Sequence, residues 1–323
     1  MRFLLVGNYG DHNLGDEALK DYFLKHFPDI EWSVVSADPN TGEYPRLPTG
    51  LRSLFAGSWI KTLGALKKSD GMVFGGGSLF TDIESLRACW LWWIHAAVGR
   101  FFGKPILLAF QGIGPFHTRV GEWFARSVVE HAHFVSVRDP ESLLRLQSWR
   151  LRCVPVETFD PVLSLVQKGN HRGENSKTLA IIPRKNSGVR LLHRMQKRIE
   201  NHGFESIKLI SMQPGDATEE STIETLAQSI NVPSTIIPVR TLQELEGAIQ
   251  TCNCVLSERF HGGLIAWGLG IPVEIVTQAP GDKLSQLQGW VAQEGTDERF
   301  RALIRKGEDA LRKVLKDVSG RSR

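Results

Sequence analysis

The stretch SERFHGGLIAWGLGIPVEIV, residues Ser257–Val276, indicates the fold because a short helix lies in it between two strands. The residues just before its helix, CNCVLSE, are apolar enough for a short buried strand, and IPVEIV at its end is typical of the next strand. Between them GGLIAWGLG is apolar and ends at Gly270, as a short helix does. A strand, a helix and a strand in succession are the repeating unit of a parallel α/β sheet.

Charged side chains gather where this strand ends and the helix begins. Glu258, Arg259 and His261 stand there, directly before the pair Gly262 and Gly263. A helix start presents backbone N–H groups and the positive end of the helix dipole, and glycines let an anion approach those groups. Arg259 adds a fixed positive charge, and His261 can be protonated near neutral pH. The stretch therefore predicts an anion site with a proton donor.

The alternation of strands and helices continues through both halves of the chain. The expected strands are nearly continuous apolar runs, which is typical of parallel sheets covered on both faces. We predict an α/β fold with two Rossmann-like domains that face each other across a cleft. The expected ranges are 1–166 for the first domain, 178–290 for the second and 291–323 for a C-terminal amphipathic helix, with Gln167–Thr178 as linker.

Glycines and polar residues follow several of the expected strands, where ligands of such sheets bind. Those that we single out are Asn13, Asp16, Glu17, Gly76, Gly77, Gln111, Arg138 and Arg184. Several of them have a structural alternative. Asp16 and Glu17 are also the first-turn carboxylates that a helix dipole favours, Gly76 and Gly77 also suit a turn with positive φ, and Arg138 can pair with Asp160.

Taken together, the arginines indicate the ligand. Arg138, Arg184 and Arg259 each stand at the end of an expected strand, and guanidinium groups match the geometry of carboxylates and phosphates. The ligand is therefore expected to be small and polyanionic. The sequence has no P-loop, no nucleophile elbow and no cluster of metal ligands, so we expect neither a metal nor a bound cofactor.

The composition excludes several classes of protein. With 41% hydrophobic and 23% charged residues the chain is typical of globular proteins, and a net charge of +4 without a basic and aromatic patch predicts no nucleic-acid partner. The four cysteines show no zinc spacing, which favours reduced thiols. The N-terminal MRFLLVGNYG is too short an apolar run for a signal peptide. We therefore expect a cytoplasmic protein.

The most apolar segment, Cys89–Phe110, is rich in tryptophan. Arg100 and Lys104 interrupt it, so we do not expect a helix that spans a membrane. Its main interpretation is a buried amphipathic helix followed by a strand. The alternative is a helix that lies on a membrane, which would make the protein peripherally membrane-associated.

In their order along the chain, these motifs resemble those of the polysaccharide pyruvyl transferase family. The motifs that carry the resemblance are GNYGDHNLGDEAL, GGGSLFTD, QGIGP, SVRDPES, DPVL and SERFHGGLIAWGLGIPV. The resemblance covers most of the chain, roughly Phe3–Leu287. The resemblance implies a GT-B-like fold and phosphoenolpyruvate as donor substrate. The product would be a pyruvate ketal on a cell-wall glycan or exopolysaccharide, or on its lipid-linked precursor, with phosphate released.

The resemblance also assigns roles to residues. The family's Arg-x-His pair falls on Arg259 and His261, its strand-end Arg-Asp on Arg138 and Asp139, and its Gly-Asp-Glu on Gly15, Asp16 and Glu17. His261 would be the general acid and Asp16 the base. The donor would be bound on the side of the second domain by Arg259, Arg184, Gly262 and Gly263, together with Arg138 of the first domain. The acceptor would be bound by Asn13, Glu17, Gly76, Gly77 and Gln111 on the side of the first.

Two other functions remain open at this point. One is a GT-B glycosyltransferase that uses a nucleotide sugar, which would need a carboxylate for ribose near the donor helix. The helix after Gly263 reads LIAWGLG and has no acidic residue, which counts against this function. The other is a non-catalytic protein that binds a glycan or an effector, which retention of both Arg259 and His261 disfavours.

Overall fold

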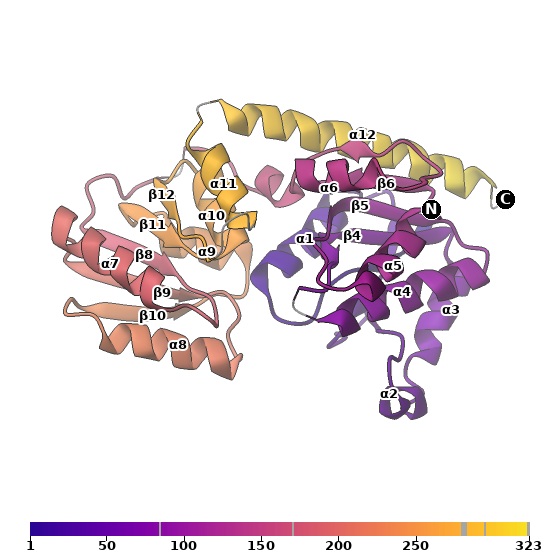
Figure 1. The fold of residues 1–323 in the computed structure, drawn as a ribbon, viewed down its shortest axis with the longest axis horizontal. Helices are drawn as coiled ribbons and strands as arrows, with labels where there is room; N and C mark the ends of the chain where they lie inside the picture. The colour runs from indigo at the N-terminus through magenta and orange to yellow at the C-terminus, as the bar shows by residue number, and fades with distance from the viewer. Residues whose placement is uncertain (84, 170, 279–282, 294, 322–323) are drawn as a thin grey trace. The chain divides into compact units, whose positions relative to one another are not determined.

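The computed structural model describes residues 1–83, 85–169, 171–278, 283–293 and 295–321 (Figure 1). It divides into two compact units. The N-terminal unit contains Met1–Asp11, Leu19–Pro161 and the chain from Phe300 onward, and the second unit contains His12–Ala18 and Val162–Arg299. The expected C-terminal helix therefore packs as part of the N-terminal unit rather than as a separate segment.

The N-terminal unit is built on a parallel sheet. Within the described ranges it has seven strands in the order β3-β2-β1-β4-β5-β6-β7. The strands are β1 (Arg2–Val6), β2 (Glu31–Ser36), β3 (Tyr44–Pro45), β4 (Gly71–Phe80), β5 (Ile106–Ile113), β6 (Phe134–Val137) and β7 (Val156–Glu157). The sequence pattern does not reveal β3 and β7, which are two residues long each. The strand order reverses between β1 and β4, which is the doubly wound arrangement.

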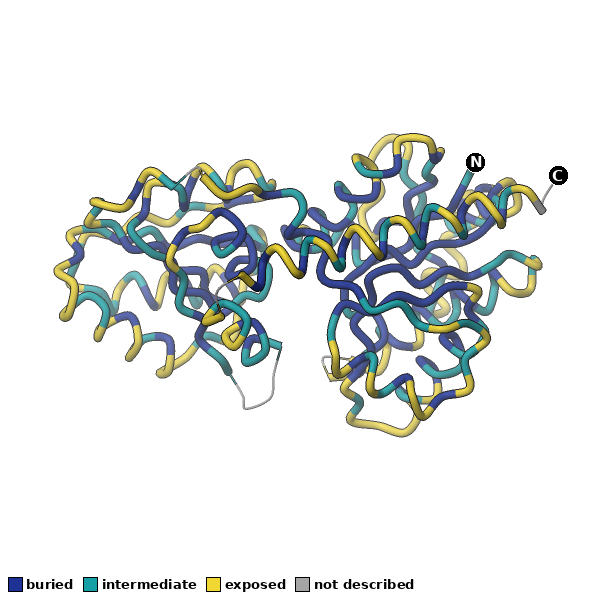
Figure 2. The backbone as a smooth tube through the Cα atoms, turned by 90° about the horizontal axis from the view of Figure 1, so that it is seen from above, coloured by how far each residue is buried: buried dark blue, intermediate teal, exposed yellow. Residues whose placement is uncertain are grey.

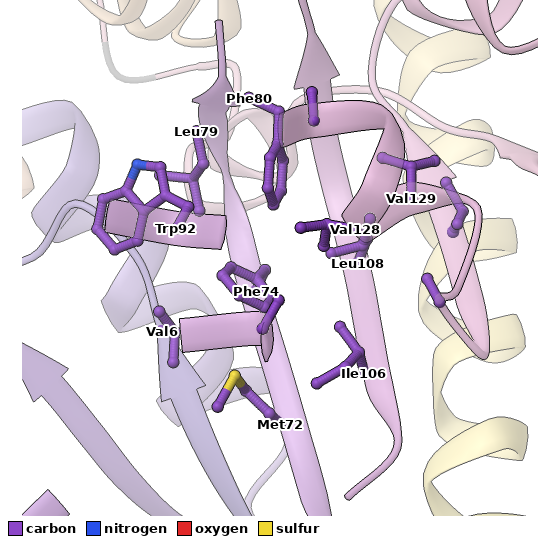
Figure 3. Packing of buried hydrophobic residues seen from close by; sticks show 14 of the residues in the cluster. Val6, Met72, Phe74, Leu79, Phe80, Trp92, Ile106, Leu108, Val128 and Val129 are labelled. Carbon is purple, nitrogen blue, oxygen red and sulfur yellow. The ribbon is translucent and has the colours of Figure 1, made fainter. Parts of the chain in front are cut away.

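Helices cover both faces of this sheet (Figure 1). The helices of the unit are α2 (Leu51–Phe55), α3 (Ile60–Lys68), α4 (Leu86–Phe101), α5 (Arg119–Val129), α6 (Pro140–Leu146) and the greater part of α1 (Leu14–His26) and of α12 (Thr296–Arg321). The first residues of α1, up to Ala18, and of α12, up to Arg299, belong to the second unit. Side chains of α3, α4 and α5 share one core cluster with Val6, Phe74 and Leu108 of the strands (Figure 3). On the other face, Tyr22 of α1 packs edge-to-face on Phe110, and Gly307 of α12 lies against the same ring. Figure 2 shows the result, with buried strands inside exposed helical surfaces.

The tryptophan-rich segment forms α4 and then β5, as its main interpretation predicts. Cys89, Trp92 and His95 are buried, and Gly99 packs closely on Ile106 and Met72. No helix in the described part of the chain is long and apolar enough to cross a membrane.

The second unit repeats the doubly wound order on a smaller scale. Its described residues form five parallel strands in the order β10-β9-β8-β11-β12. The strands are β8 (Thr178–Ile182), β9 (Ser206–Ser211), β10 (Ser234–Pro238), β11 (Cys254–Ser257) and β12 (Val273–Ile275). The helices are α7 (Val189–His202), α8 (Ala217–Gln228), α9 (Leu242–Ile249), α10 (Phe260–Gly268) and α11 (Lys283–Val291). β11, α10 and β12 follow one another between Cys254 and Ile275, so the strand, helix and strand predicted around the SERFHGG motif are confirmed.

The expected linker packs against the second unit. A short 3-10 helix (Pro161–Leu165) precedes the linker. Within the linker, Arg172 N donates to Gln250 O at 2.9 Å. Gly173 lies so close to Cys252 that a Cβ would stand 2.2 Å from the Cys252 carbonyl oxygen. Asn170 lies outside the described residues.

Candidate functional site

The predicted anion site lies where the strand order of the smaller sheet reverses. β8 and β11 are hydrogen-bonded neighbours at this point, and β8 continues into Arg184 while β11 continues into Glu258, Arg259 and His261. Ligands of doubly wound sheets bind beyond the carboxyl ends of the strands at this position. The fold therefore brings Arg184 and the SERFHGG motif to one edge of one sheet.

The first and last motifs of the sequence meet at His261. The segment His12–Ala18 belongs to the second unit, where Leu14 N donates to Met212 O at 3.1 Å. Gly15 lies directly against the imidazole, since a Cβ at this position would stand 1.9 Å from His261 Nδ1. Only glycine fits there, which explains Gly15 by contact with a side chain rather than by contact with a phosphate.

Asn13, Asp16 and Glu17 lie at the start of α1. Asn13 Oδ1 accepts a hydrogen bond from Gly15 N at 3.1 Å, as the cap of a helix does. Asp16 and Glu17 stand in the first turn of α1, where the helix dipole favours carboxylates. Both have half-buried side chains. This structural role is compatible with a catalytic one, because Asp16 directly follows the residue that contacts His261.

Arg259 forms a buried ion pair with Glu219 of α8. The Glu219 side chain is 0% exposed and also accepts hydrogen bonds from Ser211 Oγ at 2.9 Å and Gln213 N at 3.0 Å. Arg259 Nε donates to Pro183 O at 3.1 Å. The guanidinium is thereby fixed in direction and its charge is largely balanced. Sequence reasoning missed Glu219, because a glutamate in the acidic first turn of a helix is expected to face solvent.

Gly262 and Gly263 are buried, and both make close contacts inside the second unit. A Cβ on Gly262 would stand 2.9 Å from Ile182 Cδ1, and one on Gly263 would stand 2.4 Å from Ile275 Cδ1. The glycines let α10 lie close to the strands on either side of it. That packing also fixes the helix start, on which His261 stands.

Glu258 is a second residue that the sequence analysis did not assign to the site. Its carboxyl is 2% exposed and accepts a hydrogen bond from Ser187 Oγ. Burial raises the pKa of Glu258, although the hydrogen bonds and the charges of Arg184 and Arg190 oppose the shift. A buried carboxyl of this kind holds a proton more readily than an exposed one.

Arg184 and Arg190 also bring positive charge to this sheet edge. Both act on the Glu258 carboxyl, and Arg190 Nη1 donates to Thr277 O at 2.6 Å. Arg184 N donates to Ser187 Oγ at 2.8 Å, which holds the loop after β8 in a turn. Arg184 follows β8 at the same sheet edge, where a guanidinium suits an anion.

In the N-terminal unit, Arg138 adopts the alternative role that the sequence left open. It forms an ion pair with Asp160, which is 0% exposed, and its Nη2 donates to Ser78 Oγ at 2.9 Å. Asp139 caps α6, where its Oδ1 accepts from Ser142 N at 2.7 Å. Both side chains thus have structural partners within this unit.

The glycine triplet and Gln111 are also buried in the N-terminal unit. Gly76 and Gly77 have φ of +82° and +84°, which favours glycine, and Tyr9 Oη donates to Gly75 O at 2.7 Å. Gln111 is 0% exposed and its Nε2 donates to three backbone oxygens, those of Phe74, Gly76 and Ala109. These contacts give Gly76, Gly77 and Gln111 a role in shaping the carboxyl ends of β4 and β5.

The assembled groups are suited to binding an anion and moving a proton. The second unit offers a cationic Arg184, a buried carboxyl on Glu258 and an imidazole on His261 at one helix start. Within the described residues, no three His, Cys, Asp or Glu side chains gather in the way that metal ligands do.

Solved structures with the same fold cover nearly the whole chain. The UDP-N-acetylglucosamine 2-epimerase of Rickettsia bellii is 13% identical, with a TM-score of 0.60 over 99% of this chain and 97% of that one. HepE of Anabaena in complex with UDP-glucose is 12% identical, with a TM-score of 0.57 over 99% and 98%. At these identities the likeness shows the fold alone, which is GT-B-like with two Rossmann-like units. A comparison with curated proteins gives no significant match.

A family model gives the more specific result. The model of the polysaccharide pyruvyl transferases matches residues 13–276. The matched range begins at Asn13, which caps α1, and ends at Val276 after β12, so it includes both Gly15 and His261, which lie in contact. The chain belongs to the polysaccharide pyruvyl transferase family and is a transferase.

Proposed function

We propose that the protein transfers pyruvate from phosphoenolpyruvate to two hydroxyls of one sugar and releases phosphate. The acceptor is a cell-surface glycan or its lipid-linked precursor, reached from the cytoplasm with peripheral contact to a membrane. The observation that carries this proposal is the contact of His261 with Gly15, at the edge of the sheet that also bears Arg184. It brings together the two most specific motifs of the family around a group that can donate a proton.

In the proposed reaction, His261 donates a proton to the methylene carbon of phosphoenolpyruvate. The central carbon then develops oxocarbenium character, and a sugar hydroxyl attacks it while its proton passes to Asp16. A second hydroxyl of the same sugar forms the second C–O bond as the C–O bond to phosphate breaks, and its proton passes to His261, which restores the acid. The products are the ketal and inorganic phosphate.

Arg184 and the start of α10 support the donor in this scheme. A guanidinium and the positive end of a helix dipole stabilise the carboxylate of the donor and the charge that develops on the leaving phosphate. Arg259 contributes through its position, since its charge is balanced by Glu219. Arg138 would reach the donor only if its ion pair with Asp160 opens, so we place it second to Arg184.

The experiment is calorimetric titration of the protein with phosphoenolpyruvate and with UDP, in the presence of a panel of saccharides, followed by a phosphate-release assay. UDP is the competing ligand because the structural neighbours are described with UDP or UDP-sugars. We expect phosphoenolpyruvate to bind and Arg184→Ala to weaken its binding. Arg194→Ala is the matched control, since Arg194 lies on an exposed part of the same unit.

His261→Ala should lower the rate of phosphate release by about 10²- to 10⁴-fold, which is the usual contribution of a positioned acid. His193→Ala, at an exposed histidine of the same unit, should leave the rate unchanged. Binding of UDP without binding of phosphoenolpyruvate would replace the proposal with a glycosyltransferase. A normal rate in His261→Ala would remove His261 from the mechanism.

A further inference from the structure

A group of exposed apolar side chains lies on α2 and just after it, apart from the site described above. Leu51, Leu54 and Phe55 of α2 and Ile60 of α3 are 74%, 44%, 83% and 60% exposed. We call these four residues the α2 patch. Single exposed apolar residues are ordinary on protein surfaces, but several in one short segment mark a surface that interacts.

The core of the N-terminal unit does not account for α2. All residues of α2 are described and none of them is buried, and Figure 1 shows this helix projecting beyond α3. A helix of five residues is too short to be stable by its own hydrogen bonds in water and depends on the packing of its apolar face. The α2 patch is therefore suited to burial against something outside the chain.

The start of α4 lies beside the α2 patch and extends the apolar surface. Arg87 Nη2 donates to Thr49 Oγ1 at 3.5 Å, which joins the first turn of α4 to the residues that precede α2. Leu86 and Trp90 in the first turns of α4 are 39% and 38% exposed. Indole rings with one exposed edge favour the boundary between water and lipid.

The charges of these segments have one sign. Residues 44–69 contain five Lys or Arg and no Asp or Glu, and the first turn of α4 adds Arg87. Arg52 stands inside the α2 patch and Lys61 directly after it, and both are exposed. Basic residues among exposed apolar ones complement a surface of anionic lipid headgroups.

We propose that the α2 patch and the start of α4 dock on an anionic phospholipid bilayer. The apolar side chains enter the headgroup region while Arg52 and Lys61 pair with lipid phosphates. The inference rests on the proposed function and deepens it. A lipid-linked acceptor is held in a membrane, so the proposed function gives the protein a reason to bind one. It also moves the membrane contact from the tryptophan-rich segment as a whole to α2 and the first turns of α4.

The test is flotation of the full chain with vesicles of phosphatidylcholine and phosphatidylglycerol, with pure phosphatidylcholine for comparison. Leu54→Ser/Phe55→Ser should weaken binding by about tenfold or more, because two apolar side chains no longer enter the lipid. Arg52→Gln/Lys61→Gln should weaken binding to the anionic vesicles alone, by about 30-fold at low salt. Phe101→Ser is the matched control, because Phe101 is 84% exposed and lies at the far end of α4.

Each outcome decides the matter. Binding to anionic vesicles that the two double variants lose and Phe101→Ser keeps supports the proposal. No binding by the unaltered chain, or an equal loss in Phe101→Ser, overturns it. A dimer in light scattering that Leu54→Ser/Phe55→Ser converts to a monomer, without vesicle binding, also overturns it and assigns the patch to a second copy. The same variants are also titrated with phosphoenolpyruvate in the absence of vesicles. If phosphoenolpyruvate binds but the vesicles do not, this inference fails while the proposed function stands.

Discussion

Replacement of Glu219 by glutamine is the sharpest test of how the second unit holds its candidate site. The variant keeps the shape of the side chain and an oxygen that accepts from Ser211 Oγ and Gln213 N, so it removes little besides the charge. The guanidinium of Arg259 is then left without its buried counterion. Loss of one partner of a buried pair typically costs about 3–5 kcal/mol of unfolding free energy.

The lower end of that range applies here. The Arg259 side chain is 10% exposed, so water reaches part of its guanidinium, and Arg259 Nε keeps its hydrogen bond to Pro183 O. We therefore expect Glu219→Gln to cost about 3 kcal/mol. The double variant with Arg259→Gln should cost less than the sum of the two single variants by about 2 kcal/mol, because it leaves no unbalanced charge.

The assay is native-state hydrogen exchange followed by mass spectrometry on peptides from α8, β11 and α10. It reports the opening free energy of the second unit, which a single melting curve of a chain with two units does not. Glu220→Gln is the matched control, since Glu220 is the next residue on α8 and is exposed. A cost in Glu219→Gln no larger than in Glu220→Gln, or strict additivity with Arg259→Gln, would refute the reasoning.

Three further predictions concern the other contacts of the site residues. Gly15→Ala should displace the imidazole of His261. Because a misplaced catalytic group slows a reaction, we expect phosphate release to slow by about tenfold or more. The melting temperature of the variant checks that it still folds. Glu258→Gln should stabilise the protein at pH 8 in thermal melts. The raised pKa of Glu258 means that folding favours the protonated carboxyl, so the gain should fade as the pH falls to about 4, and a gain independent of pH would contradict this account. Asp160→Asn should leave Arg138 buried without a counterion and cost about 3–5 kcal/mol in the opening free energy of the N-terminal unit, measured by native-state hydrogen exchange on peptides from β6, and a loss below about 1 kcal/mol would contradict a charge-balancing role.

The sequence was sufficient for the overall architecture because the strands are continuous apolar runs separated by periodic helices. It was insufficient between Ser36 and Gly71, where Pro45, Pro48 and several glycines interrupt any period. The two-residue strand β3 and the exposed helix α2 lie in that segment. A helix without a buried face leaves no amphipathic signal, so no pattern could have predicted α2.

For the candidate site, the sequence located the right strand ends but not the contacts between side chains. The meeting of Gly15 with His261 and the pairing of Arg259 with Glu219 join residues that are distant along the chain. Charge and spacing alone could not tell which arginines are balanced inside the protein. The resemblance to the family is confirmed by the family model, while the roles of Asp16 and His261 stay predictions.

The chain leaves the N-terminal unit, forms most of the second unit and then returns to the N-terminal unit. During synthesis the second unit is therefore complete before the N-terminal unit is. The N-terminal unit closes only with α12, which supplies Phe300 as a stacked partner of Phe159 and brings Gly307 against Phe110. During synthesis that face of the large sheet stays open while Val162–Arg299 emerges and folds. A nascent chain therefore carries exposed apolar surface until its last helix is made, and a premature stop before Phe300 should yield a protein that aggregates rather than a smaller active one.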